Sequence, residues 1–296
     1  MLQEKQNAIE VVGTLSEVDL NERTTSEGKE YVAGKIVIKS KVKLHNEMID
    51  VEIPFNVYAN KFTNDGKENP SYRSIMSVKN DMTSIAACGD PASASYVRVY
   101  TDKGGLRENS FFDKTGRLVE AVRINSGFFN VVPRDKYEDT ATFSTTIFIL
   151  SIDDEMDRDG MPTGNKKIKA AVPGYKGVVN VIDYKVVSKQ AIEYMDTYWS
   201  KADTVKVYGV IAYTSDVQII HEEVGFGDPV EKRVTRSKKE LIITSGSPAA
   251  LDEEESFDSS EIAKAMTMRK AELEKKKEEA TTPAPKAKSE VSEWGF

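Results

Sequence analysis

Apolar and polar residues alternate with a period of two through most of the first part of the chain. The clearest runs cover residues 9–15, 32–38 and 49–57. Such alternation indicates β-strands that bury one face and expose the other to water. The polar stretch between the first two runs, residues 21–30, contains Gly28 and is typical of a hairpin loop.

The rest of this first block contains shorter runs. Its expected elements are an irregular polar stretch over 60–72, a short helix over 79–87, a strand over 96–100, and a hairpin with arms 106–112 and 117–124 around a turn at 113–116. Pro133 ends the block. Three strands, a short helix and then further strands are the element order of an OB barrel.

A second block repeats this order of elements. Its expected elements are strands at 143–152, 168–172, 178–187, 205–213 and 241–243, polar loops at 153–166 and 225–233, and a helix at 188–200 that Ser188 caps. The two blocks share no obvious residue identity, so the repeat is inferred from element order alone. We therefore predict a mainly β fold of two tandem OB-like five-stranded barrels, in domains 1–133 and 141–248.

The composition changes near the end of the chain. Residues 252–280 are highly charged, and their Lys/Glu pattern predicts a helix over 259–280 that is solvated in its second half. A Pro/Ala/Lys spacer then opens a flexible acidic tail, 281–296. The candidate partner-binding residues of the tail are Glu290, Glu293, Trp294, Gly295 and Phe296.

An aromatic tip that ends in a carboxylate is suited to an apolar pocket with a basic rim on a partner protein. Disordered tails also end in such residues by accident, so the tail alone leaves both interpretations open.

Length and charge narrow the choice of function. The 296 residues suggest about two domains, and 39% hydrophobic with 30% charged residues is typical of a soluble globular protein. No apolar run is long enough to span a membrane, and the first residues lack a signal-peptide pattern. Cys88 is the only cysteine, which excludes an intrachain disulfide and favours the reducing cytoplasm.

Negative charge is concentrated after residue 251. That region holds 12 Asp/Glu and 8 Lys/Arg, so it carries −4 of the total net charge of −7. The remaining body is close to neutral and would need a local basic face to bind nucleic acid.

No motif of an enzyme stands out. The two histidines, His45 and His221, have no Cys or His near them in sequence, so neither a zinc site nor a catalytic triad is indicated. Residues 155–160 imitate the start of a calcium loop, but Lys166 stands where that loop needs a bidentate Glu. We expect a binding protein rather than an enzyme, with no cofactor and no metal.

Cations and aromatic residues share the wet faces of several predicted strands. Bases stack on aromatic rings, and cations follow the phosphates without reading sequence. The candidate nucleic-acid-binding residues are Lys35, Lys39, Lys41, Lys43, Tyr96, Arg98, Tyr100, Arg107, Phe111, Phe112, Arg117, Arg123, Lys167 and Lys169. Lysine and tyrosine are also common on ordinary wet strand faces, and either phenylalanine can equally belong to the core.

These features together resemble single-stranded DNA-binding proteins, in particular bacteriophage members with OB folds and an acidic C-terminal tail that ends in an aromatic residue. The similarity lies in the element order, the opening run 8–15, the hairpin 106–124 and the end of the tail. The chain departs from that family because its tail lacks an unbroken Asp run and its body has few tryptophans.

The resemblance implies sequence-independent binding and protection of single-stranded DNA in replication, recombination and repair. It also implies that the tail recruits partner proteins, in the bacterial host cytoplasm if a phage encodes the protein. An anionic tail would compete with phosphate for the same cations. Two other functions stay open: a phage structural or assembly protein built of β-barrels, and a replisome adaptor that does not touch DNA.

Overall fold

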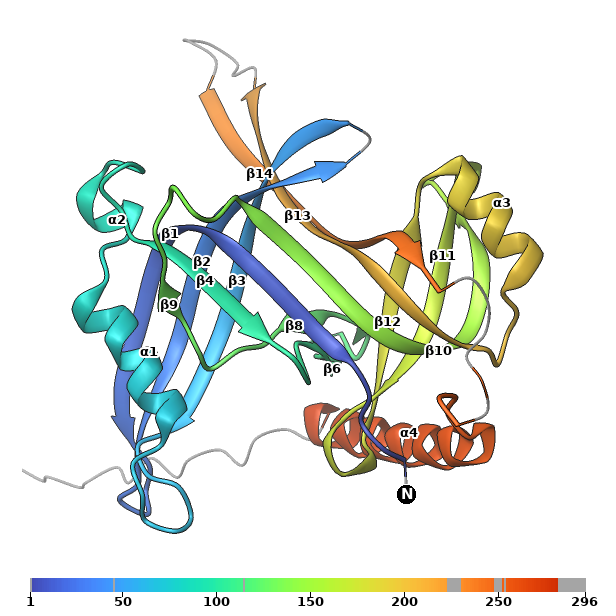
Figure 1. The fold of residues 1–296 in the computed structure, drawn as a ribbon, viewed down its shortest axis with the longest axis horizontal. Coiled ribbons are helices and arrows are strands. Elements are labelled where there is room, and N and C mark those ends of the chain that lie inside the picture. The colour runs from blue at the N-terminus through green and yellow to red at the C-terminus, as the bar shows by residue number, and fades with distance from the viewer. Residues whose placement is uncertain are drawn as a thin grey trace, which may run out of the picture.

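The computed structural model describes residues 2–44, 46–113, 115–222, 230–247, 252 and 254–281. The first half of the chain forms β1 (Asn7–Thr24), β2 (Glu30–Leu44), β3 (Glu47–Asn60), α1 (Pro70–Asp81), α2 (Ile85–Cys88), β4 (Tyr96–Thr101), β5 (Leu106–Glu108), β6 (Phe111–Phe112), β7 (Leu118–Val119), β8 (Val122–Ile124) and β9 (Asn130–Val131). The second half forms β10 (Thr140–Met156), β11 (Pro162–Pro173), η1 (Tyr175–Gly177), β12 (Val179–Val186), α3 (Lys189–Tyr198), β13 (Thr204–Glu222), β14 (Val230–Gly246) and α4 (Ser259–Thr281). Figure 1 shows the two halves side by side, with α4 below the second half.

Strand pairing follows the same plan in both halves. In the first half, β1, β2 and β3 pair in sequence, β8 lies parallel to β3, and β4 pairs with β1. In the second half, β10, β11 and β12 pair in sequence, β14 lies parallel to β12, and β13 pairs with both β14 and β10. The strand β1 also pairs with β10, so both halves contribute to one 12-stranded sheet. The prediction of a mainly β fold with a C-terminal helix is confirmed.

One apolar core runs through both halves. Ile9 and Phe55 of the first half belong to the same buried cluster as Tyr184 and Ile243 of the second half. The long strand β13 reaches across the molecule and contacts β3 (Figure 1). The buried faces of alternating strands therefore meet in a core that the two halves share.

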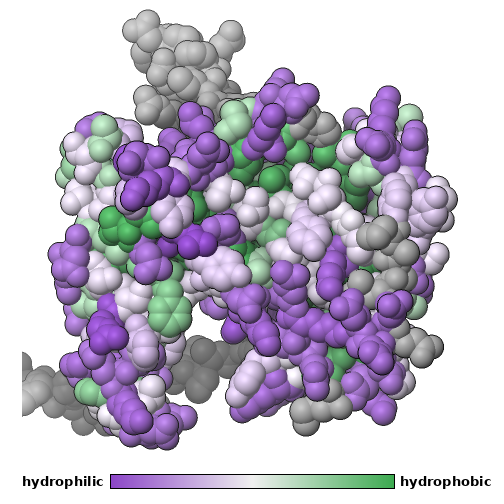
Figure 2. Space-filling view, viewed as in Figure 1, coloured by the Kyte–Doolittle hydropathy of each residue, from purple (hydrophilic) through white to green (hydrophobic). Residues whose placement is uncertain are grey.

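The helix α4 packs against the second half at its beginning. Phe257, which precedes the helix, and Ile262 and Ala265 within it share a buried cluster with Phe148 of β10. The later part of α4 is mainly exposed, as its charged composition predicts. Figure 2 shows mainly hydrophilic residues over the lower part of the second half, where α4 lies.

The structure corrects the single helix expected over residues 79–87, because α1 ends at Asp81 and a separate short helix, α2, covers Ile85–Cys88. The observed α1 begins at Pro70, inside the stretch expected to be irregular, and ends at Asp81. Pro70 suits the first helical position because its missing N–H is not needed there, and the Asn69 side chain accepts a hydrogen bond from the Ser71 backbone N–H at 3.0 Å. Asn69 and Pro70 are typical turn residues, so the sequence pattern favours a loop here, whereas in the structure they start the helix.

The structure also corrects the loop expected over residues 153–166. Most of that range is strand, because β10 extends to Met156 and β11 starts at Pro162. Asp154 pairs in register with Lys166, and their side chains form an ion pair at 3.0 Å. The Asp157 carboxylate accepts hydrogen bonds from the backbone N–H groups of Asp159 and Met161, both at 2.9 Å. The residues that imitate a calcium loop therefore form a tight hairpin turn.

Two elements near the end of the second half also differ from expectation. The strand β14 is much longer than the expected 241–243 and includes residues 230–233 of the expected polar loop; residues 225–229 of that loop lie outside the described residues. The helix α3 begins after its N-cap Ser188, as predicted, but Trp199 follows the helix and is buried beside Gly246.

Candidate nucleic-acid interface

The lysines of β2 point outward from one face of that strand, but they are not alone there. Lys35 forms an ion pair with Glu17 at 2.8 Å, and Lys39 lies 3.9 Å from Glu52. Lys41 stands opposite Asp50 in the register with β3. Lys43, the last of the four, is exposed and stands opposite Met48. Carboxylates on the neighbouring strands thus largely balance this face, which is less basic than the sequence pattern of β2 suggests.

Tyr96 was expected on the wet face of β4, and that placement is wrong. Its side chain is buried, its hydroxyl donates a hydrogen bond to Asp139 at 2.8 Å, and its ring lies 4.8 Å from the Arg134 guanidinium. Burial, together with the hydrogen bond to Asp139, raises the pKa of Tyr96. Residues 134–139 cover this ring, which the local alternation of β4 could not indicate.

The outer part of β4 keeps an exposed aromatic and cationic cluster. The Arg98 guanidinium lies 5.6 Å from the Tyr100 ring and 5.7 Å from the Tyr137 ring. Its Nε donates a hydrogen bond to Glu10 at 2.7 Å. Tyr100 is 48% exposed, so its ring is available to a flat ligand. Tyr137 is a member that sequence analysis missed, because it lies in a segment without strand alternation.

The predicted hairpin 106–124 is present, but each of its arms is divided into two short strands. At its base β5 pairs with β8, and nearer its turn β6 pairs with β7. It docks onto the second half: the Glu108 backbone N–H donates to Asn180 at 3.0 Å, and Glu108 accepts from the Val181 backbone N–H at 2.8 Å. Of its candidate residues, Arg107, Phe111, Arg117 and Arg123 are exposed and Phe112 is half-buried. The hairpin therefore bridges the two halves.

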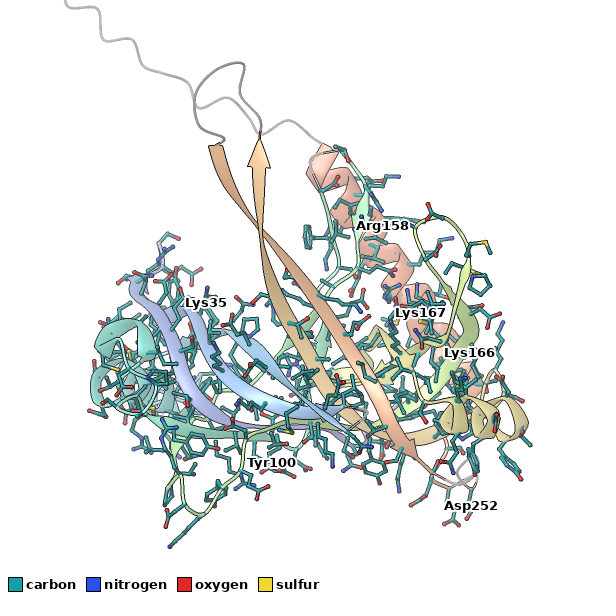
Figure 3. All side chains as sticks on the ribbon, turned by 90° about the horizontal axis from the view of Figure 1, so that it is seen from above. Lys35, Tyr100, Arg158, Lys166, Lys167 and Asp252 are labelled. Carbon is teal, nitrogen blue, oxygen red and sulfur yellow. The ribbon has the colours of Figure 1, made fainter. Side chains whose placement is uncertain are left out.

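A groove of about 680 Å³ opens where this hairpin meets β11, β12 and β14. Its cationic lining residues are Lys167, Lys169, Lys185 and Lys239, of which sequence analysis named the first two. Its acidic lining residues are Glu120, Asp154, Glu155, Asp183 and Glu240. Figure 3 shows Lys166 and Lys167 together in the second half, whereas Lys35 and Tyr100 lie elsewhere on the first half. The structure brings the hairpin and β11 together but leaves the β2 lysines and the β4 cluster on separate surfaces.

Most cations of the groove are already paired. Lys167 contacts Asp183 at 2.7 Å and Lys169 contacts Glu120 at 3.2 Å. Lys185 lies between Glu155 at 2.8 Å and Glu240 at 3.1 Å. A phosphate that enters the groove must therefore compete with carboxylates for these lysines.

The Glu155–Lys185–Glu240 group is held firmly. Burial by itself would raise the pKa of Glu155, but hydrogen bonds from Lys185, Asn165 and Thr163 outweigh it and lower the pKa to about 2. Burial would lower the pKa of Lys185, yet the hydrogen bonds to the two glutamates raise it. Glu155 and Lys185 therefore stay ionised over the ordinary pH range, and their ion pair forms a fixed part of the groove wall.

A second aromatic cluster escaped sequence analysis altogether. Tyr31 of β2 and Tyr58 of β3 have ring centroids 5.1 Å apart, and Tyr58 is 60% exposed. The exposed Phe62 lies nearby along the chain, with the Lys61 ammonium 5.8 Å from its ring. The sequence does contain a signal for Tyr58, because it takes the next exposed position when the 49–57 alternation is extended by one residue. A single tyrosine at such a position, however, gives no reason to select it.

The tail residues 290–296 fall outside the described residues. No set of three or more His, Cys, Asp or Glu side chains suited to a metal occurs in the part of the chain that the structure describes. In that same part, no helix is long and apolar enough to cross a membrane.

No curated protein matches the sequence. Among solved structures, the wild-type single-stranded DNA binding protein from Thermus aquaticus is similar, with a TM-score of 0.50 and 8% identity over 84% of this chain and 95% of that chain. A deletion mutant of the Thermus aquaticus protein has a TM-score of 0.47 and 10% identity over 84% of this chain and 97% of that chain. At these identities the likeness to the wild-type protein concerns the fold alone. A family model described as YorF matches residues 5–279, which is most of the sequence, and the chain therefore belongs to the YorF family.

Proposed function

We propose that this protein binds single-stranded DNA without regard to base sequence and shields it during replication, recombination and repair. The observation that carries the proposal is the exposed Tyr100–Arg98–Tyr137 cluster on a fold shared with the Thermus aquaticus single-stranded DNA binding protein. Aromatic rings next to cations are what a sequence-tolerant stacking surface needs.

Three surfaces support this function in different ways. The Tyr31–Tyr58 pair and the Tyr100–Arg98–Tyr137 cluster provide rings for bases, while the groove beside the hairpin provides lysines for phosphates. The carboxylates within the groove would weaken binding to a uniformly charged duplex and favour a flexible strand that can adjust its phosphates to individual lysines. The C-terminal tail would then recruit partner proteins in the cytoplasm through Trp294 and Phe296.

The proposal is tested by fluorescence anisotropy of a labelled oligo-dT at low and moderate salt, with the matching duplex as competitor. We expect binding at or below micromolar protein that weakens as salt rises, because displaced counterions drive phosphate binding. The duplex should compete poorly. Absence of binding at micromolar protein, or equal competition by the duplex, contradicts the proposal.

A further inference from the structure

One carboxylate of the hairpin stands between cations from two distant parts of the chain. Glu120, which lines the groove, lies 3.2 Å from the Lys169 ammonium of β11 and 3.4 Å from the Arg269 guanidinium of α4. Lys169 is a candidate from the sequence pattern, whereas Glu120 and Arg269 lie far from it along the chain and leave no local signal. Three elements thus converge at a single acidic side chain.

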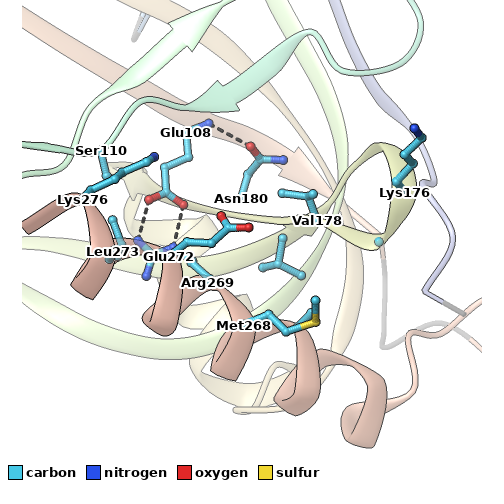
Figure 4. A pocket seen from close by; sticks show the side chains of 13 residues that line it. Glu108, Ser110, Lys176, Val178, Asn180, Met268, Arg269, Glu272, Leu273 and Lys276 are labelled. Atoms are coloured by element: carbon cyan, nitrogen blue, oxygen red, sulfur yellow. Dashed lines mark hydrogen bonds and ion pairs between the residues drawn. The ribbon is translucent and has the colours of Figure 1, made fainter. Parts of the chain in front are cut away.

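Arg269 is fixed in place by a different residue. Its Nε and Nη2 donate to the two carboxylate oxygens of Glu108 at 2.7 Å and 2.6 Å (Figure 4). The side chains of Arg269 and Glu108 are only 16% and 10% exposed. This bidentate pair orients the guanidinium, so that Nη2 also faces Glu120.

The Glu120 contacts are looser than this pair. Glu120 and Lys169 are each 38% exposed, and their separation exceeds that of the short Arg269–Glu108 bonds. An exposed, long ion pair contributes little to stability and is screened by salt. Glu120 can therefore leave its position without loss of the Arg269–Glu108 pair.

We propose that Lys169 and Arg269 form a phosphate-binding site for the backbone of single-stranded DNA, and that Glu120 occupies this site when no DNA is bound. A phosphodiester has two free oxygens and one negative charge, so it can accept from the same two donors that the carboxylate now uses. The inference rests on the proposed function and deepens it, because it adds α4 to the DNA-binding surface. It also gives Glu120 the role of an internal competitor.

The direct test is the Glu120→Gln variant, measured by oligo-dT anisotropy against salt. We expect about 3- to 10-fold tighter binding at low salt, because the competing charge is removed while the cations remain. Lys169→Gln should bind more weakly, and its slope of log affinity against log salt should fall by about 0.7, the loss of one phosphate contact to a single strand. Urea unfolding of each variant checks that the fold is retained.

Glu22→Gln is the matched control. Glu22 pairs with Lys79 at 2.8 Å on the first half, is about half exposed, and contacts no residue of the groove. It removes the same charge and should tighten binding far less than Glu120→Gln. Equal gains in the two variants would show a general charge effect and would overturn the site while the proposed function stands.

Two further results separate the possible failures. The gain from Glu120→Gln should shrink in the Glu120→Gln/Lys169→Gln double variant, and an undiminished gain would show that Glu120 does not compete at Lys169. Arg269→Lys keeps a cation beside Glu108 but loses the forked geometry of the guanidinium. In this background, Glu120→Gln should therefore tighten oligo-dT binding less than it does in the unaltered protein. If neither the unaltered protein nor any variant binds oligo-dT, the proposed function itself fails.

Discussion

At the scale of single residues, the exposed aromatic rings have a free face, whereas many lysines are already paired with carboxylates. Tyr58 is largely exposed and offers a free face, whereas Lys61 near it is already paired with Glu30 at 2.8 Å. Lys167 is likewise paired with Asp183. A base that stacks displaces only water, but a phosphate must displace a carboxylate. We therefore expect aromatic residues to contribute more to affinity than most of these lysines.

The Tyr58→Ala variant tests this expectation. We predict that its free energy of binding to oligo-dT weakens by about 1–3 kcal/mol, the usual contribution of one stacked base. Tyr198→Ala is a close control, because Tyr198 is 56% exposed and stacks on Tyr194 at 4.6 Å, much as Tyr58 stacks on Tyr31. Anisotropy titrations should show a loss for the first variant and little change for the second. Similar affinities in both would remove the Tyr31–Tyr58 pair from the interface.

A second residue-scale prediction concerns Lys185. In Lys185→Met, the carboxylates of Glu155 and Glu240 lose their shared cation while they remain mostly buried, so we expect the free energy of unfolding at neutral pH to fall by about 3 kcal/mol. Lys238→Met removes a far more exposed partner of Glu240 and should cost below about 1 kcal/mol. Urea unfolding curves measure both values.

The pH dependence of the same variant has a definite sign. In the unaltered protein the pKa of Glu155 is lowered to about 2, so its stabilising contribution is present above pH 4.5 and is lost as the pH falls from there toward 2. Without Lys185 the two carboxylates repel, and protonation relieves that repulsion. The deficit of the variant should therefore shrink between neutral pH and about pH 4, and a constant deficit would contradict the ion-pair argument.

At the scale of elements, the buried Arg269–Glu108 ion pair is a strong contact between α4 and the hairpin. The apolar contacts of α4 lie near its beginning, and Arg269 is the cation that ties its middle to Glu108. We predict that Arg269→Ala leaves the buried Glu108 carboxylate without its cation, costs about 3–5 kcal/mol, and raises hydrogen exchange in the later part of α4. Lys270→Ala, at an exposed neighbouring position, is the control. Unchanged exchange in the Arg269 variant would show that α4 is held by other contacts.

The elements also show what the sequence could and could not reveal. The strands β2 and β3 could be predicted because buried and more exposed positions alternate over most of their length, so the pattern is visible locally. The first half of β1 is buried at nearly every position, and its apolar run alone indicates a strand. The ends of β10 and β11 were missed because their hairpin is wet on both faces and contains the turn residues of a loop. Likewise, Pro70 starts a helix although proline usually argues for a turn.

The groove was beyond prediction for a different reason. Lys169 could be selected as a cation on a strand, but its neighbour Glu120 comes from a hairpin in the other half, and Arg269 from a helix a hundred residues later in the sequence. Contacts between such distant segments leave no local pattern. Tyr96 illustrates the same limit, because the residues that bury it lie outside its strand.

At the scale of the whole molecule, the two halves share both a sheet and a core. The strands β1 and β10 pair from Asn7 opposite Thr145 to Val12 opposite Thr140, and the buried cluster runs through both halves. The sequence-based division into domains 1–133 and 141–248 leaves open whether each folds alone. A shared core on this scale favours a single cooperative unit.

Two natural probes test this cooperativity. Cys88, exposed at the end of α2, can carry a dye in the first half, and Trp199 reports on the second half in a Trp294→Phe background. We predict that both signals give the same midpoint in urea unfolding. Labelled protein without urea, compared with unlabelled protein by circular dichroism, controls for effects of the dye. Separate midpoints would instead establish two independently folding domains.

The pairing of β1 with β10 has a consequence for folding of the chain during its synthesis. As the ribosome releases the chain, the first strand emerges long before the strand that will cover its edge, and β13 reaches β3 only after more than two hundred residues have been made. Until then the nascent first half must keep an apolar flank and an unpaired strand edge exposed, which are the features that chaperones hold and that drive aggregation. Slow synthesis between residues 133 and 222 would prolong that exposure, so the speed of translation there should affect the yield of folded protein.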